Sequence, residues 1–254
     1  MANARSHSPL VLFLVAIPLL SGGWLMASFP IFIFFALSPL FALTDRANTA
    51  TVWEKMEWVL LALTLGFLSA RAFDLSFLVA SMVYGILFTL VFVGQVWVKQ
   101  VLGHRAGKIT IILLWLALEY ILLKVRAGDG VYLADAIRLK PGWVNWNVHT
   151  GYLGTSLWIL ATNGLVYQTV LSDKPFQWHW IAFTVIFLGA PLVYSYYLTG
   201  PSISREDMMN LYSGKMIVQD VTYLARGELM VRTAAWLSIL ILLFTFVKSQ
   251  TTKL

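Results

Sequence analysis

The sequence predicts an all-α, polytopic membrane protein with about eight transmembrane helices. Of its 254 residues, 59% are hydrophobic and only 12% are charged, and the mean hydropathy is +0.76. A soluble domain has about 25% charged residues, and one of about 250 residues buries only about three quarters of its unfolded surface. The apolar residues also lie in long blocks, not in the alternation of barrel strands. Together these observations exclude a soluble enzyme and a disordered chain.

A membrane-spanning helix needs about 20 apolar residues, and eight candidate stretches follow one another along the chain. The second and third are short. No small-x-small cleavage site follows the first stretch, so we expect it to remain as a helix and not to be removed. The predicted spans are Leu10–Ser28, Phe29–Leu43, Glu57–Ala70, Leu75–Val98, Ile109–Val125, Tyr152–Leu171, Trp180–Leu198 and Val231–Val247.

These spans divide the chain into three parts. We expect an N-terminal seven-helix bundle over residues 1–198, an external loop over residues 199–230, and a last helix with a short tail over residues 231–254. An even number of spans places both termini on one side and the long loops on the other. Short basic loops at residues 46–55 and 99–108 favour cytoplasmic termini. The net charge of +6 fits cations facing anionic headgroups and does not call for a nucleic-acid partner.

Glu119 lies near the middle of the fifth predicted span. A charged side chain at that depth costs roughly 2.5–3.5 kcal/mol on insertion scales, so it is a candidate for function by default. Lys124 is five residues away and points elsewhere, while Arg126 shares the face but lies two turns off. Glu119 is therefore either a hydrogen-bonded tie between two helices or part of a functional site.

The sixth predicted span carries a polar stripe. Ser156, Asn163 and Tyr167 fall at i, i+7 and i+11, on one face of a helix. Gly151 and Gly154 supply the small residues that let helices approach closely. The stripe is either a set of interhelical hydrogen bonds inside a packed bundle or the wall of a lipid or substrate cavity.

No residue of this chain is predicted to be catalytic or to bind a metal or cofactor. His149, beside Trp143 and Trp146, is compatible with a base or metal ligand, but an aromatic belt at headgroup level accounts for it equally well. No nucleophile and base fall together, and the chain has no cysteine. The absence of cysteine removes disulfides, thiolate ligands and a cysteine nucleophile at once.

Several stretches, in order along most of the chain, resemble the apolipoprotein N-acyltransferases. The strongest match is to the family segment in which a glycine–serine–leucine–tryptophan run leads to a transmembrane asparagine, and it is similar to Bacteroidetes members. The matching stretches are Trp24-Leu-Met-Ala-Ser-Phe-Pro30 running into Leu37-Ser-Pro-Leu40, Leu114-Trp-Leu-Ala-Leu-Glu-Tyr120, Trp143-Val-Asn-Trp146, Thr150-Gly-Tyr-Leu-Gly-Thr-Ser-Leu-Trp-Ile-Leu-Ala-Thr-Asn163 and Thr222-Tyr-Leu-Ala-Arg-Gly-Glu228.

The resemblance covers the transmembrane part of the family only. The family has eight helices and, between the seventh and eighth, a nitrilase-like domain with a glutamate base, a lysine and a cysteine that takes the acyl group. Here residues 199–230 stand in that place, too short for such a domain, and there is no cysteine. Residues 128–135 also depart from the family's Trp/Phe-Pro-Trp stretch. None of the family's catalytic roles can therefore be assigned to a residue of this chain.

The resemblance implies a non-catalytic subunit of the bacterial inner membrane that scaffolds or docks an envelope complex. Its expected partners are membrane lipids and other envelope membrane proteins or lipoproteins, with a phospholipid or lipoprotein anchor as a possible bound molecule. The alternatives are the membrane half of a split acyltransferase whose catalytic domain is a separate chain, and a lipid or solute transporter. The residues expected at lipid or partner contacts are Glu119, Trp143, Trp146, His149, Gly151, Gly154, Ser156, Trp158, Asn163 and Tyr167.

Overall fold

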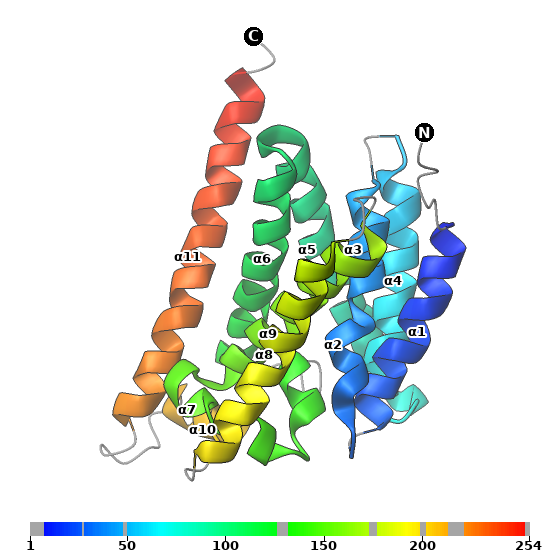
Figure 1. Ribbon diagram of the computed structural model, residues 1–254. Helices are drawn as coiled ribbons and strands as arrows, with labels where there is room; N and C mark the ends of the chain where they lie inside the picture. Colours follow the sequence, from blue (N-terminus) through cyan, green and yellow to red (C-terminus); the bar gives the residue numbers. More distant parts are fainter. Residues whose placement is uncertain are drawn as a thin grey trace.

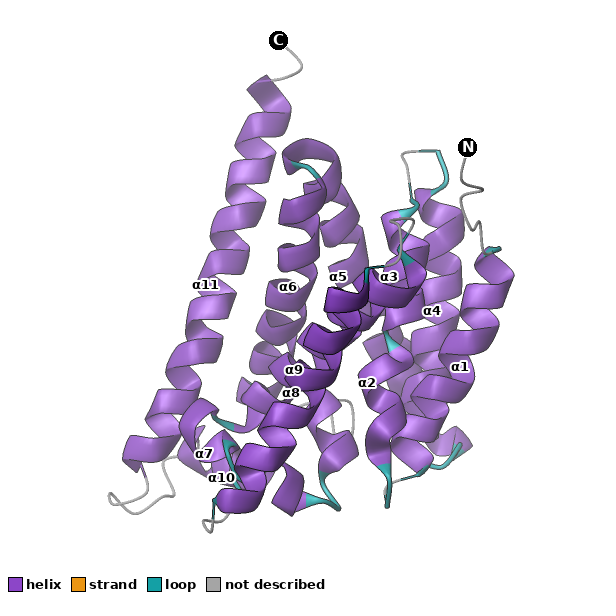
Figure 2. Ribbon diagram, viewed as in Figure 1, coloured by secondary structure: helices purple, strands orange, loops and turns teal. Residues whose placement is uncertain are grey.

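The computed structural model of the chain is helical throughout the part that it describes. Every regular element there is a helix, and Figure 2 shows no strand among the coloured residues. The predicted all-α class is therefore confirmed. Parts of the predicted external loop (199–201, 213–220) and of the tail (252–254) lie outside the described residues. The structure describes residues 8–26, 28–47, 50–125, 132–172, 177–198, 202–212 and 221–251, the first seven of the last range by backbone only.

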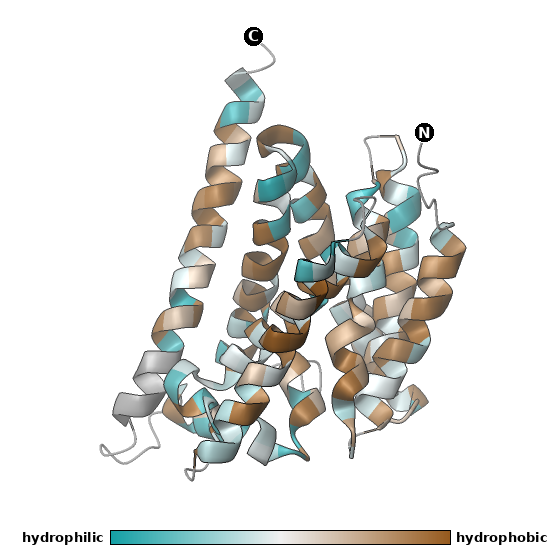
Figure 3. Cartoon of the chain, viewed as in Figure 1, coloured by the Kyte–Doolittle hydropathy of each residue, from teal (hydrophilic) through white to brown (hydrophobic). Residues whose placement is uncertain are grey.

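Four of the described helices are long and apolar enough to cross a membrane. Length and composition thus support four spans, against the eight that we predicted. Figure 3 shows apolar residues along the middle of these helices and polar residues toward their ends. Few residues of the last two are buried inside the molecule. The four are α5 (Leu78–Leu102) with the short η2 (Leu75–Phe77) before it, α6 (His104–Lys124), α9 (Trp178–Tyr197) and the Glu228–Thr251 part of α11 (Val221–Thr251).

Three further predicted stretches are helices that are shorter or more polar. α1 (Pro9–Leu25) has only 17 residues. α4 (Val52–Ser69) carries three charged side chains in its first turns, at positions 54, 55 and 57. α8 (Tyr152–Val166) continues into a five-residue π-helical segment, η5 (Tyr167–Leu171), so that the two together match the predicted sixth span.

The predicted second span is not one helix. It consists of η1 (Pro30–Phe32), α2 (Ile33–Ala36) and α3 (Ser38–Asp45). Pro39 lies in the first turn of α3, where a backbone N–H has no partner within the helix, so its missing N–H costs no hydrogen bond. A single helix running from α2 through Pro39 would instead lose a hydrogen bond at this position. The chain is therefore broken at Leu37, and the backbone groups at the break need other partners.

The two ends of the bundle differ in construction (Figure 1). α1 begins and α11 ends at the same end, which we call the terminal end. The opposite end is closed by a cap, defined as residues 132–151 and 202–212. The described parts of the segments that follow the fifth and the seventh predicted spans therefore lie opposite the terminal end. The cap contains η3 (Leu133–Ile137), η4 (Pro141–Trp143), α7 (Asn147–Thr150) and α10 (Arg205–Tyr212).

The predicted external loop contains more helix than expected. α10 lies inside it, and α11 begins at Val221, ten residues before the predicted start of the last helix. The side chains of Ser204 and Asp207 cap α10 reciprocally: the Asp207 amide donates to the Ser204 hydroxyl (3.2 Å), and the Ser204 amide donates to the Asp207 carboxylate (2.7 Å). Such a capping box starts a helix in a polar sequence, where apolar periodicity gives no signal.

An aromatic cluster fixes α6 against α5. Phe88, Phe92 and Trp115 are fully buried, and the rings of Phe88 and Trp115 lie 4.3 Å apart. Phe92 meets the same indole edge-on at 6.1 Å, an arrangement that aromatic rings favour. This cluster sets the rotation of α6 and brings Glu119, one turn beyond Trp115, into the interior.

Candidate functional site

Glu119 is fully buried and lies five residues before the end of α6, not near the middle as we expected. The helix is longer toward its start than predicted, because it begins directly after Gly103, whose φ of +96° ends α5. The Oε1 atom of Glu119 accepts hydrogen bonds from the Trp115 indole (3.1 Å) and the Leu133 backbone amide (2.9 Å). Glu119 therefore ties η3 of the cap to α6.

Ser156 lies beside Glu119 and completes the same tie. Its hydroxyl contacts the Glu119 carboxyl group and accepts a hydrogen bond from the Ala134 backbone amide at 3.2 Å. Two predicted residues, from the fifth and sixth spans, are thus brought together. Next to them, burial raises the pKa of Tyr132 well above its ordinary value, and the Glu119 charge adds to the effect, so the phenol stays protonated.

Asp135 joins η3 of the cap to α8 and to α10. The Tyr152 hydroxyl of α8 donates to its Oδ1 atom at 2.5 Å, and Arg205 of α10 forms an ion pair with Oδ2 at 3.4 Å. Both charged side chains are mostly buried, with 8% and 20% of the side chain exposed. A paired charge of this kind is expensive to break, because the remaining partner is left buried and alone.

Asn145 and Asn147 hold the cap to the chain that follows α9. The Asn145 amide donates to the Ser195 hydroxyl (2.7 Å), and its side chain donates to the Leu198 carbonyl (3.1 Å). The Asn147 side chain accepts from the Ile203 amide (2.7 Å) and donates to the Ile203 carbonyl (2.9 Å). Sequence reasoning missed both asparagines and the Asp135–Arg205 pair, since these residues lie in loops without periodicity.

Each predicted aromatic residue of the cap contacts a ring outside the cap. Trp143 meets Phe29 edge-on at 6.2 Å, and Trp146 meets Trp158 edge-on at 5.8 Å. His149 stacks on Tyr194 at 6.3 Å, with the hydroxyl 3.5 Å from Nε2. Aromatic contact at the rim of a bundle is what a headgroup-level belt provides.

Trp158 is a core residue of α8. It is 3% exposed, its ring lies 4.4 Å from that of Phe34, and its indole donates to the Phe187 carbonyl at 3.1 Å. This bond links α8 to α9. It uses the single N–H donor of the indole, so this group cannot donate to a ligand as well.

The two predicted glycines are required by the backbone geometry where the chain enters α8. Gly151 separates α7 from α8 with φ +77°, a conformation that L side chains rarely adopt. A Cβ atom on Gly154 would lie 2.1 Å from the Thr150 hydroxyl oxygen. Both glycines therefore permit the sharp entry from the cap into α8.

A cleft of about 250 Å³ lies between η3, α7, α8 and the start of α10. Asp135, Arg138, Arg205 and Glu206 contribute charge of both signs to its lining. The hydroxyl of Thr155 also lines the cleft; it is buried and has no hydrogen-bond partner among the described residues. The cleft is the polar opening of the cap.

Asn163 satisfies the backbone groups that are left unpaired at the break between α2 and α3. Its Oδ1 atom accepts from the Leu37 and Ser38 amides at 2.7 and 3.1 Å, and its Nδ2 atom donates to the Ile33 and Ile159 carbonyls at 2.9 Å each. These four bonds use the whole capacity of the side chain. Buried backbone groups must be paired, and this residue pairs those that the broken helix exposes.

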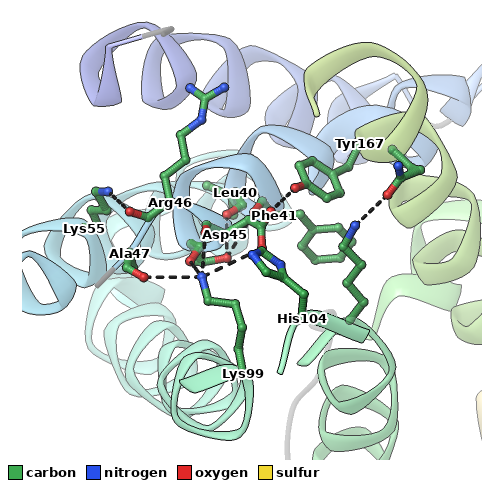
Figure 4. A network of polar contacts seen from close by, with 12 residues as sticks. Leu40, Phe41, Asp45, Arg46, Ala47, Lys55, Lys99, His104 and Tyr167 are labelled. Carbon is green, nitrogen blue, oxygen red and sulfur yellow. Dashed lines mark hydrogen bonds and ion pairs between the residues drawn. The ribbon is translucent and has the colours of Figure 1, made fainter. Parts of the chain in front are cut away.

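Tyr167 meets a charged cluster at the terminal end, shown in Figure 4. Its hydroxyl donates to Oδ2 of Asp45, the last residue of α3, and His104 approaches Oδ1 at 3.0 Å. Lys99 lies 3.8 Å from the same carboxylate and donates to three carbonyl groups at the end of α3, with the shortest bond, 2.5 Å, to Asp45. A cation at this position caps the negative end of a helix.

A second lysine continues this capping. Lys55 donates to the Arg46 carbonyl at 2.5 Å, and burial lowers its pKa. The sequence indicated Tyr167 but not Asp45 or Lys99.

Within the described ranges, no group of three or more His, Asp or Glu side chains could hold a metal ion. No protein-family model, curated protein or solved structure matches this chain. The role of the protein is therefore argued from its own residues.

Proposed function

We propose that the protein is a non-catalytic membrane subunit of a bacterial envelope complex and that the cap is its docking surface. The observation that carries the proposal is the internal bonding of the cap. The side chains of Asn145 and Asn147 bind backbone groups of neighbouring segments, and Oε1 of Glu119 accepts from the Leu133 backbone amide. Irregular loops held in this way form a preorganised surface, which loses less conformational freedom when a partner binds.

The exposed rim of the cap supports the same role. Tyr196 and Tyr197, at the end of α9, are 85% and 75% exposed. They follow Ser195, whose hydroxyl accepts from the Asn145 amide, so their backbone is fixed by the cap. Tyrosine is enriched in protein interfaces, since it offers a large contact area with a polar end.

The resemblance to the apolipoprotein N-acyltransferases supports a membrane subunit without chemistry of its own. The tie around Glu119 lies in a stretch that resembles the family, yet the chain has no cysteine to carry an acyl group. The proposal includes the inner membrane as its location, cytoplasmic termini, and lipids and envelope proteins or lipoproteins as partners.

Site-specific photocrosslinking in cells tests the docking surface. A photoreactive phenylalanine derivative replaces Tyr197 in the full chain, and a matched variant carries it at Trp178, which is 72% exposed at the other end of the same helix. We expect a discrete adduct from position 197 and none of that size from position 178.

The outcomes separate the candidate functions. An envelope protein without a nitrilase domain, crosslinked from position 197 and co-purifying in stoichiometric amounts in mild detergent, supports the docking subunit. A nitrilase-like chain at that position supports the split acyltransferase and contradicts the non-catalytic role. A chain that is isolated alone and gives no adduct at either position contradicts both.

A further inference from the structure

A second cavity, of about 370 Å³, lies toward the terminal end, where Asp45 at the end of α3 and Lys108 near the start of α6 line it. It lies between α3, α5, α6, α8 with η5, and α9. Sites for small molecules span about 300–1,000 Å³, so this one has room for a single acyl chain and not for a whole two-chain lipid. Its apolar walls include Phe41, Ile109, Ile112, Leu165, Phe183 and Phe187.

The cavity is polar at one end and apolar along its length. Gln168 lines it near the terminal end, and Ala161 lines it seven residues earlier on the same helix. Trp180 and Phe187 line it over a matching interval of α9. At about 1.5 Å per residue, both intervals run about 10 Å along the bundle axis. An elongated ligand with one polar end fits this layout.

Two side chains give the polar end its chemistry. Gln95 of α5 is 4% exposed, and its Oε1 atom has no hydrogen-bond partner among the described residues. Lys108 of α6 donates to the side-chain Oε1 atom of Gln168 at 2.6 Å, with its ammonium 5.2 Å from the centre of the Tyr167 ring. The Asp45 carboxylate also lines the cavity, and Lys99 lies 3.8 Å from it. The Lys108 ammonium lines the same end of the cavity beside the Gln168 side chain, where an anionic group of a ligand can approach it.

The walls of the cavity leave space for a ligand. Gly164 of α8 lines it, and a Cβ atom on this glycine would meet nothing within 4 Å. Tyr167 and Gln168 enter it from the π-helical segment, a distortion that is frequent at functional sites. α9 closes the outer side with only 11% of its span buried inside the molecule.

We propose that this cavity binds a single-chain anionic amphiphile, with the acyl chain along α8 and α9 and the head group at Lys108 and Gln95. The head group is a phosphate or carboxylate beside Lys108, and a hydroxyl or amide donor of the ligand meets the Gln95 oxygen. The source is a lysophospholipid or a free fatty acid; both supply the acyl chain and the anionic group, and the lysophospholipid also supplies a hydroxyl donor. The site is independent of docking at the cap.

Native mass spectrometry of the full chain in a non-ionic detergent tests the acyl site. The probes are oleoyl lysophosphatidylglycerol and oleate. We expect one saturable adduct, weakened at least tenfold by Gly164→Leu, which fills the cavity. The matched control is Gly189→Leu on α9, where an added Cβ also meets nothing within 4 Å; it binds as the unmodified chain does. Ala161→Phe blocks the same cavity and replaces Gly164→Leu if that variant does not fold.

A zwitterionic probe and a Lys108 variant test the head-group assignment separately. Oleoyl lysophosphatidylcholine, which is zwitterionic, is expected to bind at least fivefold more weakly, and Lys108→Gln removes this preference while Lys140→Gln in the cap does not. A response to lysophosphatidylglycerol alone identifies a lysolipid, and a response to oleate alone a fatty acid. Equal binding of anionic and zwitterionic probes overturns the head-group assignment. Absence of a saturable adduct, or one that Gly164→Leu and Ala161→Phe leave unchanged, overturns the site.

Discussion

The cap and the cavity at the terminal end employ buried polar groups in opposite ways. At the cap, the side chains of Asn145 and Asn147 bind backbone amides and carbonyls of other segments, and Oε1 of Glu119 accepts from the Leu133 amide of η3, so these groups hold segments of the chain together. At the cavity, the buried Oε1 atom of Gln95 has no hydrogen-bond partner among the described residues, and Lys108 lines the same, mostly apolar, chamber. Side chains that bind backbone hold a fold together, whereas the Gln95 oxygen is the acceptor that the proposed ligand would meet.

The largest effect is expected from removing the carboxylate that holds the cap. Glu119→Ala leaves the Trp115 indole and the Leu133 amide buried without an acceptor. Each orphaned donor costs about 1–3 kcal/mol, so unfolding becomes easier by about 2–6 kcal/mol. The measurement is thermal unfolding in detergent. Glu119→Gln keeps an acceptor and is expected to retain most of the stability, and Glu206→Ala, at an exposed position of the cap, serves as control. An unfolding temperature for Glu119→Ala equal to that of the control would refute the structural tie.

A pair of glycines in one helix sharpens the comparison. Gly154→Ala places a methyl group 2.1 Å from the Thr150 hydroxyl oxygen, and overpacking of this kind costs about 1–3 kcal/mol. Gly164→Ala enters the empty cavity without a clash and gains up to about 1 kcal/mol of helix propensity. The two substitutions are chemically identical, so opposite shifts in unfolding temperature report the two surroundings. Equal shifts would show that the glycines occupy equivalent environments.

Asn147→Ala is expected to loosen the cap locally. It removes two hydrogen bonds to the backbone of Ile203, worth about 0.5–1.5 kcal/mol each. Hydrogen exchange of residues 202–204 should accelerate about tenfold, while exchange in α5 and α6 stays unchanged. Asn210→Ala, at an exposed position of α10, is the control. Acceleration throughout the bundle would mean that the cap is needed for global stability.

The sequence predicts the helices well because each is a long apolar run. All eight predicted stretches contain helix, and Tyr152–Leu171 has the predicted ends. The break at Leu37 was missed, since apolar residues continue across it and only Pro39 marks it. The start of α11 at Val221 was missed for the opposite reason, because the first turns of this helix are too polar to give an apolar signal.

The candidate residues were predicted one by one, but their partners were not. Glu119 and Ser156 stood out as polar groups in apolar spans, yet nothing in the sequence shows that both bind η3. Asp45 and Tyr167 are 122 residues apart in the chain and meet only after α3 packs beside η5. Spacing predicts which face of a helix a side chain shares, whereas contacts between distant segments depend on packing.

The smallest effect is expected where the two regions share one structural device, a hydroxyl that binds a carboxylate. Tyr167→Phe removes the hydrogen bond to Asp45 but leaves the ring under Lys108, and Lys99 and His104 still lie 3.8 and 3.0 Å from the carboxylate. The loss should be about 0.5–1.5 kcal/mol, the net value of one hydrogen bond. Tyr152→Phe is the counterpart at the cap, where the acceptor Asp135 is more deeply buried than Asp45, with 8% against 18% of the side chain exposed, so its unfolding temperature should fall further. Lysophosphatidylglycerol binding should survive both substitutions, because the ring of Tyr167 and the Lys108 ammonium remain at the cavity. A larger loss of stability from Tyr167→Phe than from Tyr152→Phe would mean that the terminal end, and not the cap, is the more tightly bonded region.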